Sequence, residues 1–523
     1  LPREAVALVV VVTLAFAVYT LDLMSWRYAF IGDEYAFYEF ANNIIRGFNR
    51  PYLLSPRGAY DVHPVFATFV QVATITLYGN DIYGWRISET LAIMLAGLPL
   101  YVFARTFVNA RAALLAVIVY LSSQHVLGLS KVGYTYSQLF VPLLGALALC
   151  ALALKRGSWL GIYLCGVASA FAFYTFAFGI PFIALPLLLL AMYGVPVGAK
   201  PWRAAAHALP LIAIFILGVG LTALPSLSDA EALQRIAGHT VANSEVKTTN
   251  NLTEQVIPNV LYTATASLAF LGHSHYVSGA HLDPLASLLM LLGVASIIAM
   301  LRRQRFAWWL LISFGLVCVF VGGFAPYPYP PIARTYILLP YYGLFVALGA
   351  TALASFVRHA RARLVLWLLF MLAIPALNLY QFFTLTDGVN PQEDIPLIVK
   401  EFQEQPNVSA FYVVTRPPFN ANVTRMILRA YNLDADKLVV VSDENPNLSL
   451  PAIKRSGKGD YVVLLLWHMP SLDRWRAGLR AQWPSLSATP LSDGTDLIHF
   501  AKLAVSANVS DGATVTPPPS SAP

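Results

Sequence analysis

Apolar runs of about 20 residues recur along most of this chain and constrain its fold more than any other feature. A helix of that length matches the hydrocarbon core of a membrane. In order, the runs cover 5–24, 82–104, 111–129, 138–154, 158–174, 176–194, 204–224, 285–301, 306–324, 336–356 and 364–383. Charged residues make up 12% of the 523 residues, about half of the roughly 25% usual in soluble domains. The sequence predicts a polytopic α-helical membrane protein with about 11 transmembrane helices.

Basic residues mark every second connection between these runs. With the N-terminus in the cytoplasm, the cytoplasmic connections contain Arg105 and Arg111, Lys155 and Arg156, Lys200 and Arg203, Arg302, Arg303 and Arg305, and Arg358, Arg361 and Arg363. This alternation follows the positive-inside rule. The net charge of +7 therefore indicates topology, and nucleic acid is not expected as a partner. We predict a multi-pass protein of the plasma membrane with a cytoplasmic N-terminus.

Three longer connections then fall on the extracytoplasmic side, at 25–81, 225–284 and 325–335. The first contains an apolar stretch, His63 to Gly79, that would break the charge alternation if it crossed the membrane. We predict a re-entrant or interfacial helix there, buried against protein. The connection 225–284 is long enough to act as a lid.

Beyond the last apolar run the composition is that of a soluble domain. We expect a transmembrane domain over 1–383, a small extracytoplasmic α/β domain over 384–505, and a disordered Ser/Thr/Pro-rich tail over 506–523. Strands that alternate with helices predict a mostly parallel sheet in the α/β domain. The predicted strands are 410–415, 438–442, 461–467 and 497–500, and the predicted helices include 393–405 and 472–482.

Two adjacent carboxylates, Asp33 and Glu34, stand at the start of an amphipathic helix in the first outer connection. The helix is predicted from apolar residues at the spacing i, i+3, i+4 and i+7. The pair has two interpretations. Asp33 is an N-cap and Glu34 a first-turn charge, or one carboxylate takes a proton from an acceptor hydroxyl as a general base.

Three cations, Arg86, Lys131 and Arg334, break the charge rule by standing at outer helix ends or in outer connections. Snorkelling accounts for each of them singly, and Glu89 offers Arg86 an ion pair on the helix surface. Alternatively, the cations together hold a phosphate on a lipid carrier.

Histidines gather in the second outer connection, where His239, His273, His275 and His281 stand near Asp283. No third ligand follows at a defined spacing, so polar loop residues are favoured over a metal site. No metal ligand is assigned, and the requirement for a divalent metal is left open.

Taken together, these segments resemble the GT-C superfamily of polyprenyl-phosphate-sugar-dependent glycosyltransferases, in its protein O-mannosyltransferase and aminoarabinose-transferase-like branch. Four segments carry the resemblance: Gly32-Asp33-Glu34 with the following helix, His63-Pro64, Arg86 and Ser88 with 111–116, and Arg334 with Tyr336 and Leu339-Pro340. The late segment is similar to the family's Arg-Tyr-x-Leu-Pro motif.

The resemblance implies a GT-C-like enzyme that moves a monosaccharide from a polyprenyl-phosphate carrier to a protein, lipid or glycan acceptor, with inversion, on the outer face. Asp33, beside Glu34, is then the base, and Lys131 and Arg334 hold the lipid phosphate. It also assigns Arg86 and Tyr336 to the donor site and expects 225–284 to close over the donor. The polyprenyl-phosphate sugar is then the donor substrate, and no cofactor is assigned.

One segment departs from the family pattern. About five residues after Lys131, where the family places a carboxylate, this chain has Tyr136, Ser137 and Gln138. Tyr136 and Gln138, with His63, are assigned to the acceptor site or its pocket. The departure leaves open a catalytically silent GT-C-like scaffold that binds a partner protein through the α/β domain. A secondary transporter, which would need polar or broken helices at mid-membrane, is a third interpretation.

Overall fold

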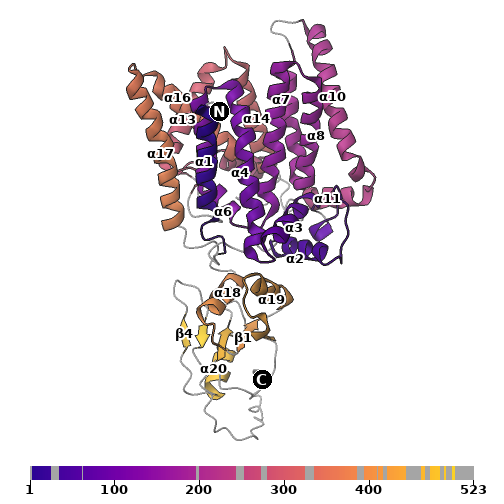
Figure 1. The fold of residues 1–523 in the computed structure, drawn as a ribbon, viewed down its shortest axis with the longest axis vertical. Helices are drawn as coiled ribbons and strands as arrows, with labels where there is room; N and C mark the ends of the chain where they lie inside the picture. Colours follow the sequence, from indigo (N-terminus) through magenta and orange to yellow (C-terminus); the bar gives the residue numbers. More distant parts are fainter. Residues whose placement is uncertain are drawn as a thin grey trace. The chain divides into compact units, whose positions relative to one another are not determined.

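The structure, a computed structural model, divides into two compact units, residues 1–389 and 390–523 (Figure 1). It describes residues 3–24, 34–61, 63–195, 200–242, 252–271, 280–323, 335–385, 394–408, 410–415, 421–442, 461–465, 472–482, 488–490 and 498–500. The predicted disordered tail, 506–523, lies outside these residues.

Unit 1 is a helix bundle. Its first half contains α1 (Arg3–Thr20), α2 (Glu34–Ile45), α3 (Phe66–Tyr78), α4 (Ile82–Phe107), α5 (Ala110–Ser122), α6 (Gln124–Ser130), η2 (Thr135–Leu139), α7 (Phe140–Arg156) and α8 (Trp159–Thr175). Its second half contains η3 (Ala177–Ile183), α9 (Ala184–Tyr193), α10 (Pro201–Leu227), α11 (Ala230–Ala242), α12 (Leu252–Thr265), α13 (Pro284–Met300), α14 (Arg305–Gly323), η5 (Tyr336–Leu338), α16 (Leu339–Ser355) and α17 (Ala360–Leu385).

Each apolar run of the sequence coincides with a helix or with two consecutive helices. Within the described residues, six helices are long and apolar enough to cross a membrane, or seven if α5 and α6, bent by 56° at their junction, form one span. Shorter apolar helices cover the remaining runs. The mostly helical membrane fold is thus confirmed, and the number of crossings stays a prediction.

Side-chain caps begin several of these helices where the sequence changes from polar to apolar. A side-chain oxygen of Asp81 accepts from the Gly84 amide at the start of α4, and Asn109 does the same for Ala112 in α5. Asp283 caps α13, whose first residue is a proline. A cap satisfies amides that have no partner within the helix, so each of these helices begins at a defined residue.

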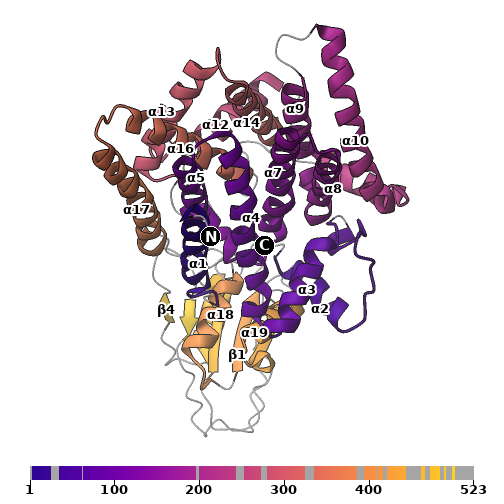
Figure 2. The same cartoon turned by 45° about the horizontal axis from the view of Figure 1, so that its top comes forward.

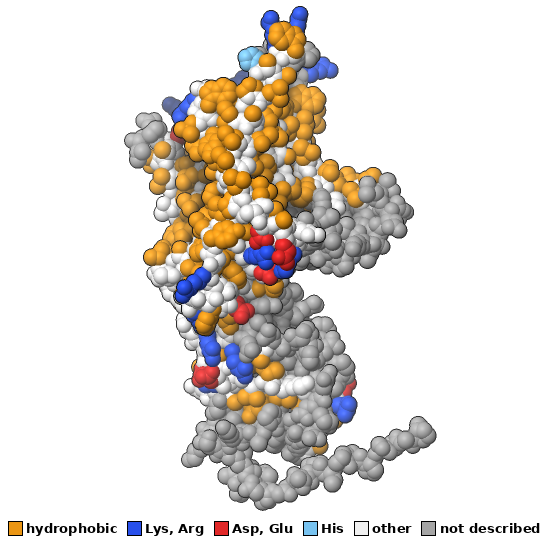
Figure 3. All heavy atoms as spheres, turned by 90° about the vertical axis from the view of Figure 1, so that its right-hand side faces the viewer, with side chains coloured by type: hydrophobic (Ala, Val, Ile, Leu, Met, Phe, Trp, Pro, Cys, Tyr) orange, Lys and Arg blue, Asp and Glu red, His pale blue; other side chains and the backbone are white. Residues whose placement is uncertain are grey.

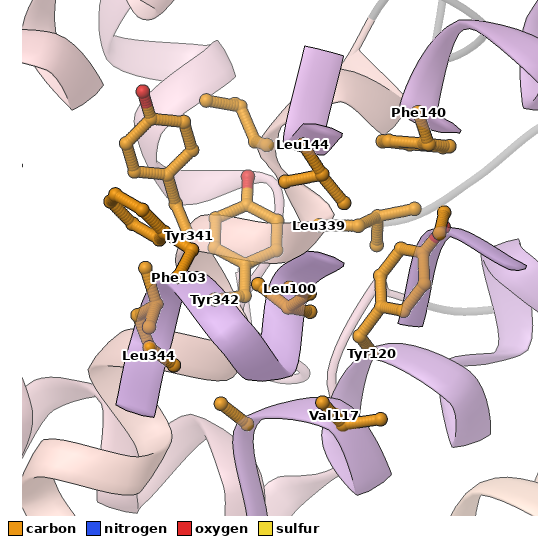
Figure 4. Packing of buried hydrophobic residues seen from close by; sticks show 14 of the residues in the cluster. Leu100, Phe103, Val117, Tyr120, Phe140, Leu144, Leu339, Tyr341, Tyr342 and Leu344 are labelled. Atoms are coloured by element: carbon orange, nitrogen blue, oxygen red, sulfur yellow. The ribbon is translucent and has the colours of Figure 1, made fainter. Parts of the chain in front are cut away.

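Small residues bring the helices of unit 1 close together. A Cβ atom built on Gly349 of α16 would lie 1.9 Å from the Leu289 carbonyl oxygen of α13, and one on Gly293 would lie 1.9 Å from the Phe345 carbonyl oxygen. Such backbone contact is how membrane helices gain packing energy without a hydrophobic driving force. Figure 4 shows the core, where side chains that include Leu100, Tyr120, Phe140 and Tyr342 meet from four different helices.

The two ends of unit 1 differ. Helices α2, α3 and α11 lie at one end, which we call the α2 end together with η2 and η5 (Figures 1 and 2). Helix α4 ends at the opposite end, where α1, α5, α10 and α17 begin. We call this the arginine end, because five arginines of the predicted cytoplasmic connections lie at these helix termini, namely Arg105, Arg111, Arg203, Arg361 and Arg363. Figure 3 shows a broad band of hydrophobic side chains, with Lys and Arg gathered beyond its upper edge.

Unit 2 contains a five-stranded sheet in the order β2-β1-β3-β5-β4. The strands β1 (Ala410–Thr415), β2 (Leu438–Ser442) and β3 (Tyr461–Leu465) are parallel, whereas β5 (Ile498–Phe500) and β4 (Ala488–Pro490) pair antiparallel. Its helices are α18 (Asp394–Glu404), α19 (Ala421–Ala430) and α20 (Leu472–Gln482). The predicted strands and helices are confirmed, and β4 is an additional strand that the sequence did not predict.

Candidate functional site

The sequence assigned nine residues to the site, and the structure describes the side chains of six. Asp33 and Arg334 lie outside the described residues, and so does the side chain of Glu34, although its backbone begins α2. The six described residues are Arg86, Lys131, His63, Tyr136, Gln138 and Tyr336. All six lie at the α2 end of unit 1.

Helix α2, at whose start the two carboxylates stand, is held by its apolar face. Of the apolar residues at the predicted spacing, Phe37 and Ala41 are buried and Phe40 and Ile44 are half-buried, and Tyr38 is buried beside them. The Phe37 ring lies 4.9 Å from that of His63, centroid to centroid. Tyr38 stacks obliquely on Trp85 of α4 at 4.8 Å and donates a hydrogen bond of 2.9 Å to the Asn80 side chain. These contacts fix the helix against α3 and α4.

Aromatic rings join the two segments that the sequence assigned to acceptor and donor. The Tyr136 ring lies parallel to the Tyr336 ring at 5.4 Å, with an interplanar angle of 15°. The Tyr136 ring also contacts the Phe176 ring at 4.2 Å, and the His63 ring stacks on the same Phe176 ring at 5.5 Å. Tyr134 donates a hydrogen bond of 2.9 Å to the Tyr136 hydroxyl. The structure therefore brings His63, Tyr136 and Tyr336 into one cluster.

Tyr336 presents a polar group inside this cluster. Its side chain is 1% exposed, and its hydroxyl has no hydrogen-bond partner among the described residues. A buried hydroxyl without a partner costs free energy. A ligand oxygen that reached this position would remove that cost.

A buried carboxylate, Glu89 of α4, organises the segment where the family pattern fails. Ser137 donates to its Oε2 at 2.6 Å, and Gln138 donates to its Oε1 at 2.7 Å. Gln71 of α3 and Ser88 donate to Oε1 at 3.3 Å and 3.2 Å. Gln71 also donates to the Gly133 carbonyl at 2.9 Å. Gln138 is therefore bound to a carboxylate, although the sequence around it contains none.

This arrangement corrects the surface ion pair expected between Glu89 and Arg86. Both side chains are fully buried, so neither lies on a helix surface. Arg86 donates to the Leu23 carbonyl at 3.2 Å, while the donors to Glu89 come from α3, α4 and η2. The prediction from the three-residue spacing was wrong, because tertiary packing gives Arg86 a backbone carbonyl and gives Glu89 side-chain donors as partners.

Arg86 and Lys131 bind the last turn of α1 and the chain that follows it. Lys131 donates to the carbonyl of Tyr19 at 3.0 Å and to that of Leu21. Its side chain is buried, and this burial lowers the pKa of Lys131 to about 8, with the charge of Asp22 opposing the shift and that of Arg86 adding to it. Snorkelling does not describe either cation. Both fix the backbone of the segment that leads to the Asp-Glu motif.

His281 plays a similar part for the segment that contains Arg334. Its Nε2 lies 2.9 Å from the hydroxyl of Thr335, and its ring stacks on His125 at 3.8 Å. Ser123 donates to its carbonyl at 3.0 Å. Burial lowers the pKa of His281 to about 4, so the ring is neutral near pH 7. His281 thus positions Thr335, the neighbour of Arg334, through an uncharged contact.

The remaining predicted histidines give no metal site in the described part of the chain. His273 and His275 lie outside it, as does the side chain of His239. Within the described ranges, no group of three or more His, Cys, Asp or Glu side chains is placed to hold a metal ion.

An ion-pair cluster joins the first and second outer connections. Arg57 forms two bonds with Asp229, of 2.6 Å and 2.7 Å, and a third of 3.2 Å with Glu231 of α11. Arg235 pairs with Glu231 and with Asp61. The Arg57 guanidinium lowers the pKa of Asp229 to about 2. This cluster fixes the beginning of the 225–284 connection to the loop that follows α2.

Sequence reasoning missed Glu89, Gln71 and Arg57 as parts of this end. A signal for Glu89 was present, because a carboxylate inside an apolar span is costly unless it has partners. Gln71 lies in the same way within the apolar stretch of α3. For Arg57, no local pattern pointed to a partner 172 residues away.

Comparison by sequence matches no protein family and no curated protein. By structure, the chain is similar to ArnT from Cupriavidus metallidurans in the apo state, with a TM-score of 0.52 and 14% identity over 94% of this chain and 97% of that chain. ArnT bound to undecaprenyl phosphate gives a TM-score of 0.49 at 15% identity, over the same shares. An Archaeoglobus fulgidus oligosaccharyltransferase in the apo form gives 0.48 at 13% identity, over 84% of this chain and 64% of that one.

Identities this low establish the fold alone. The chain has the fold of the GT-C glycosyltransferases, a class of polytopic membrane proteins. Among the structures compared, the apo ArnT structure is matched along almost the whole of both chains.

Proposed function

We propose that the protein is a membrane glycosyltransferase that moves a monosaccharide from a polyprenyl-phosphate carrier to an acceptor on the outer face of the membrane. The observation that carries the proposal is the gathering of His63, Lys131, Tyr136 and Tyr336 at one end of a GT-C fold, beside the helix that the Asp-Glu motif begins. The acceptor is a hydroxyl-bearing protein, lipid or glycan.

In the proposed reaction Asp33 is the general base. It accepts the proton of the acceptor hydroxyl while the hydroxyl oxygen attacks the anomeric carbon of the sugar. The bond from that carbon to the carrier phosphate breaks on the opposite side, and its electron pair leaves with the phosphate oxygen. A single displacement inverts the anomeric configuration. General-base assistance of this kind contributes about 10²–10⁴ in rate.

The cations supply the charge that the leaving phosphate needs. In the proposal Lys131 and Arg334 stabilise the developing negative charge, and Glu34 orients the groups around Asp33. The hydroxyl of Tyr336 lacks a partner among the described residues. In the proposal it donates a hydrogen bond to an oxygen of the polyprenyl-phosphate sugar. Arg86, bound to the Leu23 carbonyl, adds positive charge and fixes the approach to Asp33. Charge-assisted hydrogen bonds to phosphate are about twice as strong as neutral ones.

The acceptor side is built from His63, Tyr136 and Gln138. Gln138 is oriented by Glu89 at 2.7 Å and by the Ala67 carbonyl at 3.1 Å. In the family pattern a carboxylate stands within the segment that here contains 136–138. We propose that Glu89 replaces it, because Glu89 accepts hydrogen bonds from Ser137 and Gln138. The 225–284 connection closes over the donor in this proposal, with the Arg57–Asp229 pair as the fixed end of the lid.

A second candidate function is a catalytically silent GT-C-like scaffold that binds a partner protein through unit 2. One observation favours it. Lys131, Arg86 and Glu89 are engaged by groups of the protein itself, through the carbonyls of Tyr19, Leu21 and Leu23 and through four side-chain donors. These contacts stabilise the fold whether or not the protein catalyses a reaction.

Sugar transfer by the purified protein separates the two candidates. The protein in nanodiscs is supplied with radiolabelled polyprenyl-phosphate sugars, and release of carrier phosphate is measured for wild type, Asp33→Asn and Glu39→Gln. Glu39 is an exposed carboxylate of the same helix α2 and serves as the matched control. Turnover that falls by about 10²-fold or more in Asp33→Asn alone supports the transferase. A well-folded wild type without turnover on any donor favours the scaffold.

A further inference from the structure

A cavity of about 840 Å³ opens at the arginine end of unit 1, far from the candidate site. It lies between the first residues of α1, α5 and α17 and the last residues of α4 and α16. Helix α4 has 26 residues, so at about 1.5 Å per residue its two ends are roughly 39 Å apart. The cavity has the size of a ligand pocket and belongs to no part of the site described above.

Three arginines line this cavity, against one carboxylate. Arg105 pairs with Glu4 at 3.3 Å, and Tyr101 donates to the same Glu4 oxygen at 3.1 Å. Arg363 donates to the Val357 carbonyl at 3.2 Å and 2.9 Å, which neutralises none of its charge. Arg111 is exposed and makes no hydrogen bond or ion pair with the described residues. Two arginine charges therefore face the cavity without a counter-ion among those residues.

The wall of the cavity is apolar on the side of α5 and α17. Leu114, Leu364 and Trp367 contribute to it, and Leu364 is 45% exposed. Below it α17 continues with exposed Leu368 and Leu372, which form a surface suited to lipid chains. A free phosphate would satisfy the arginines but leave this wall without a ligand. A phosphate that carries acyl chains satisfies both.

We propose that this cavity binds the phosphate headgroup of an anionic phospholipid, with the acyl chains lying along α1 and α17. Basic pockets between transmembrane helices bind such headgroups because the arginines replace water around the phosphate. The planar guanidinium forms two parallel bonds with phosphate oxygens. The bound lipid joins α1, α5 and α17, which otherwise converge around an open space. This inference is independent of the proposed catalytic activity.

Lipid retention in native mass spectrometry tests the proposal. The full-length protein in detergent is incubated with equal amounts of phosphatidylglycerol and phosphatidylcholine, as wild type and as the double variant Arg111→Gln/Arg363→Gln. The matched control is Arg156→Gln/Arg302→Gln, which removes two exposed arginines of other predicted cytoplasmic connections. We expect phosphatidylglycerol to be preferred by wild type and control, and its retention to fall about tenfold or more in the cavity variant.

If both double variants lose phosphatidylglycerol equally, or if wild type does not prefer it, the proposal is overturned. Inorganic phosphate at millimolar concentration separates the sources of the anion. If it displaces phosphatidylglycerol completely and stabilises the delipidated protein to the same extent, the cavity is a free-anion site and the lipid assignment is wrong.

Discussion

The two ends of the helix bundle use positive charge in opposite ways. At the α2 end, Arg86 and Lys131 are fully buried and donate to backbone carbonyls of the segment after α1. At the arginine end, Arg105 and Arg111 are exposed and line a cavity of about 840 Å³. Buried cations bound to the backbone hold a segment in one position, whereas exposed cations around an open cavity exchange ligands with solvent or membrane.

The difference shows that cavity volume alone does not locate chemistry. The large cavity lies at helix ends whose arginines predict cytoplasmic connections, and the residues assigned to the reaction lie at the end that is filled by aromatic rings and hydrogen bonds. A donor that binds at the α2 end must therefore meet groups that the fold has already oriented. Preorganised groups of this kind are the main source of electrostatic stabilisation in enzymes.

The largest expected effect of a substitution among the described residues is that of Glu89→Ala. It would leave Ser137, Gln138 and Gln71 without their shared acceptor, at about 1–3 kcal/mol for each buried donor without a partner. We expect a clearly lower midpoint of thermal unfolding in detergent and loss of transfer activity. Glu39→Ala on the exposed side of α2 is the control and should unfold like wild type. An unchanged midpoint for Glu89→Ala would contradict the claim that this carboxylate stabilises the α2 end.

The charge of Lys131 gives a pH-dependent test of the α2 end. Its folded pKa of about 8 lies below the ordinary value of 10.5, so the folded protein binds fewer protons than the unfolded chain between these values. Stability therefore rises as the pH rises from about 8 to 10.5. Transfer that depends on the ammonium charge falls over the same range.

Lys131→Arg sharpens this test, because a guanidinium keeps its charge to above pH 12. The pH–rate profile of transfer should lose its decline above pH 8 in this variant. A decline at the same pH in Lys131→Arg and wild type would assign it to another group.

Tyr336→Phe should have a smaller effect that is confined to the donor. Removing one neutral hydrogen bond costs about 0.5–1.5 kcal/mol, or roughly three- to tenfold in KM for the polyprenyl-phosphate sugar, with the thermal midpoint unchanged. Tyr342→Phe, a buried tyrosine in the core of α16, the helix that follows η5 (Figure 4), is the matched control. Equal effects of the two substitutions would mean that Tyr336 serves packing only.

The smallest expected effect concerns the half-buried Arg57–Asp229 pair. Because the folded pKa of Asp229, about 2, lies below the ordinary 3.8, the pair stabilises the fold above pH 4 and is lost as the pH falls toward 2. Arg57→Gln should raise hydrogen–deuterium exchange in 229–235 at neutral pH by a small factor, as expected of a surface ion pair. Arg46→Gln, exposed at the end of α2, should leave exchange there unchanged.

Much of the fold follows from local sequence. The long apolar runs predicted the helices, and short apolar runs predicted β1 and β2 of unit 2 to the residue. The apolar stretch His63 to Gly79 contains the predicted helix, α3, and its re-entrant or interfacial position, which rests on the charge alternation, stays a prediction. Such features depend on neighbouring residues only, which is why one sequence suffices to find them.

The parts that the sequence could not supply depend on distant residues. Glu89 was interpreted through its neighbour Arg86, but its partners come from α3 and from η2, up to 49 residues away. The arginines of the predicted cytoplasmic connections indicated topology, and nothing in their spacing showed that three of them enclose a cavity. Strand β4, with three residues including Pro490, is too short to give a pattern.

Photo-cross-linking of the carrier tests the central claim most directly, namely that the donor binds at the α2 end. A polyprenyl-phosphate sugar with a photoreactive group near its phosphate is added to the protein in nanodiscs, irradiated, and located by peptide mass spectrometry. We expect adducts in 130–138 and around Tyr336, and their loss in the presence of excess unlabelled donor. Adducts found instead in 105–114 and 351–367 would place the carrier at the arginine end and contradict the account.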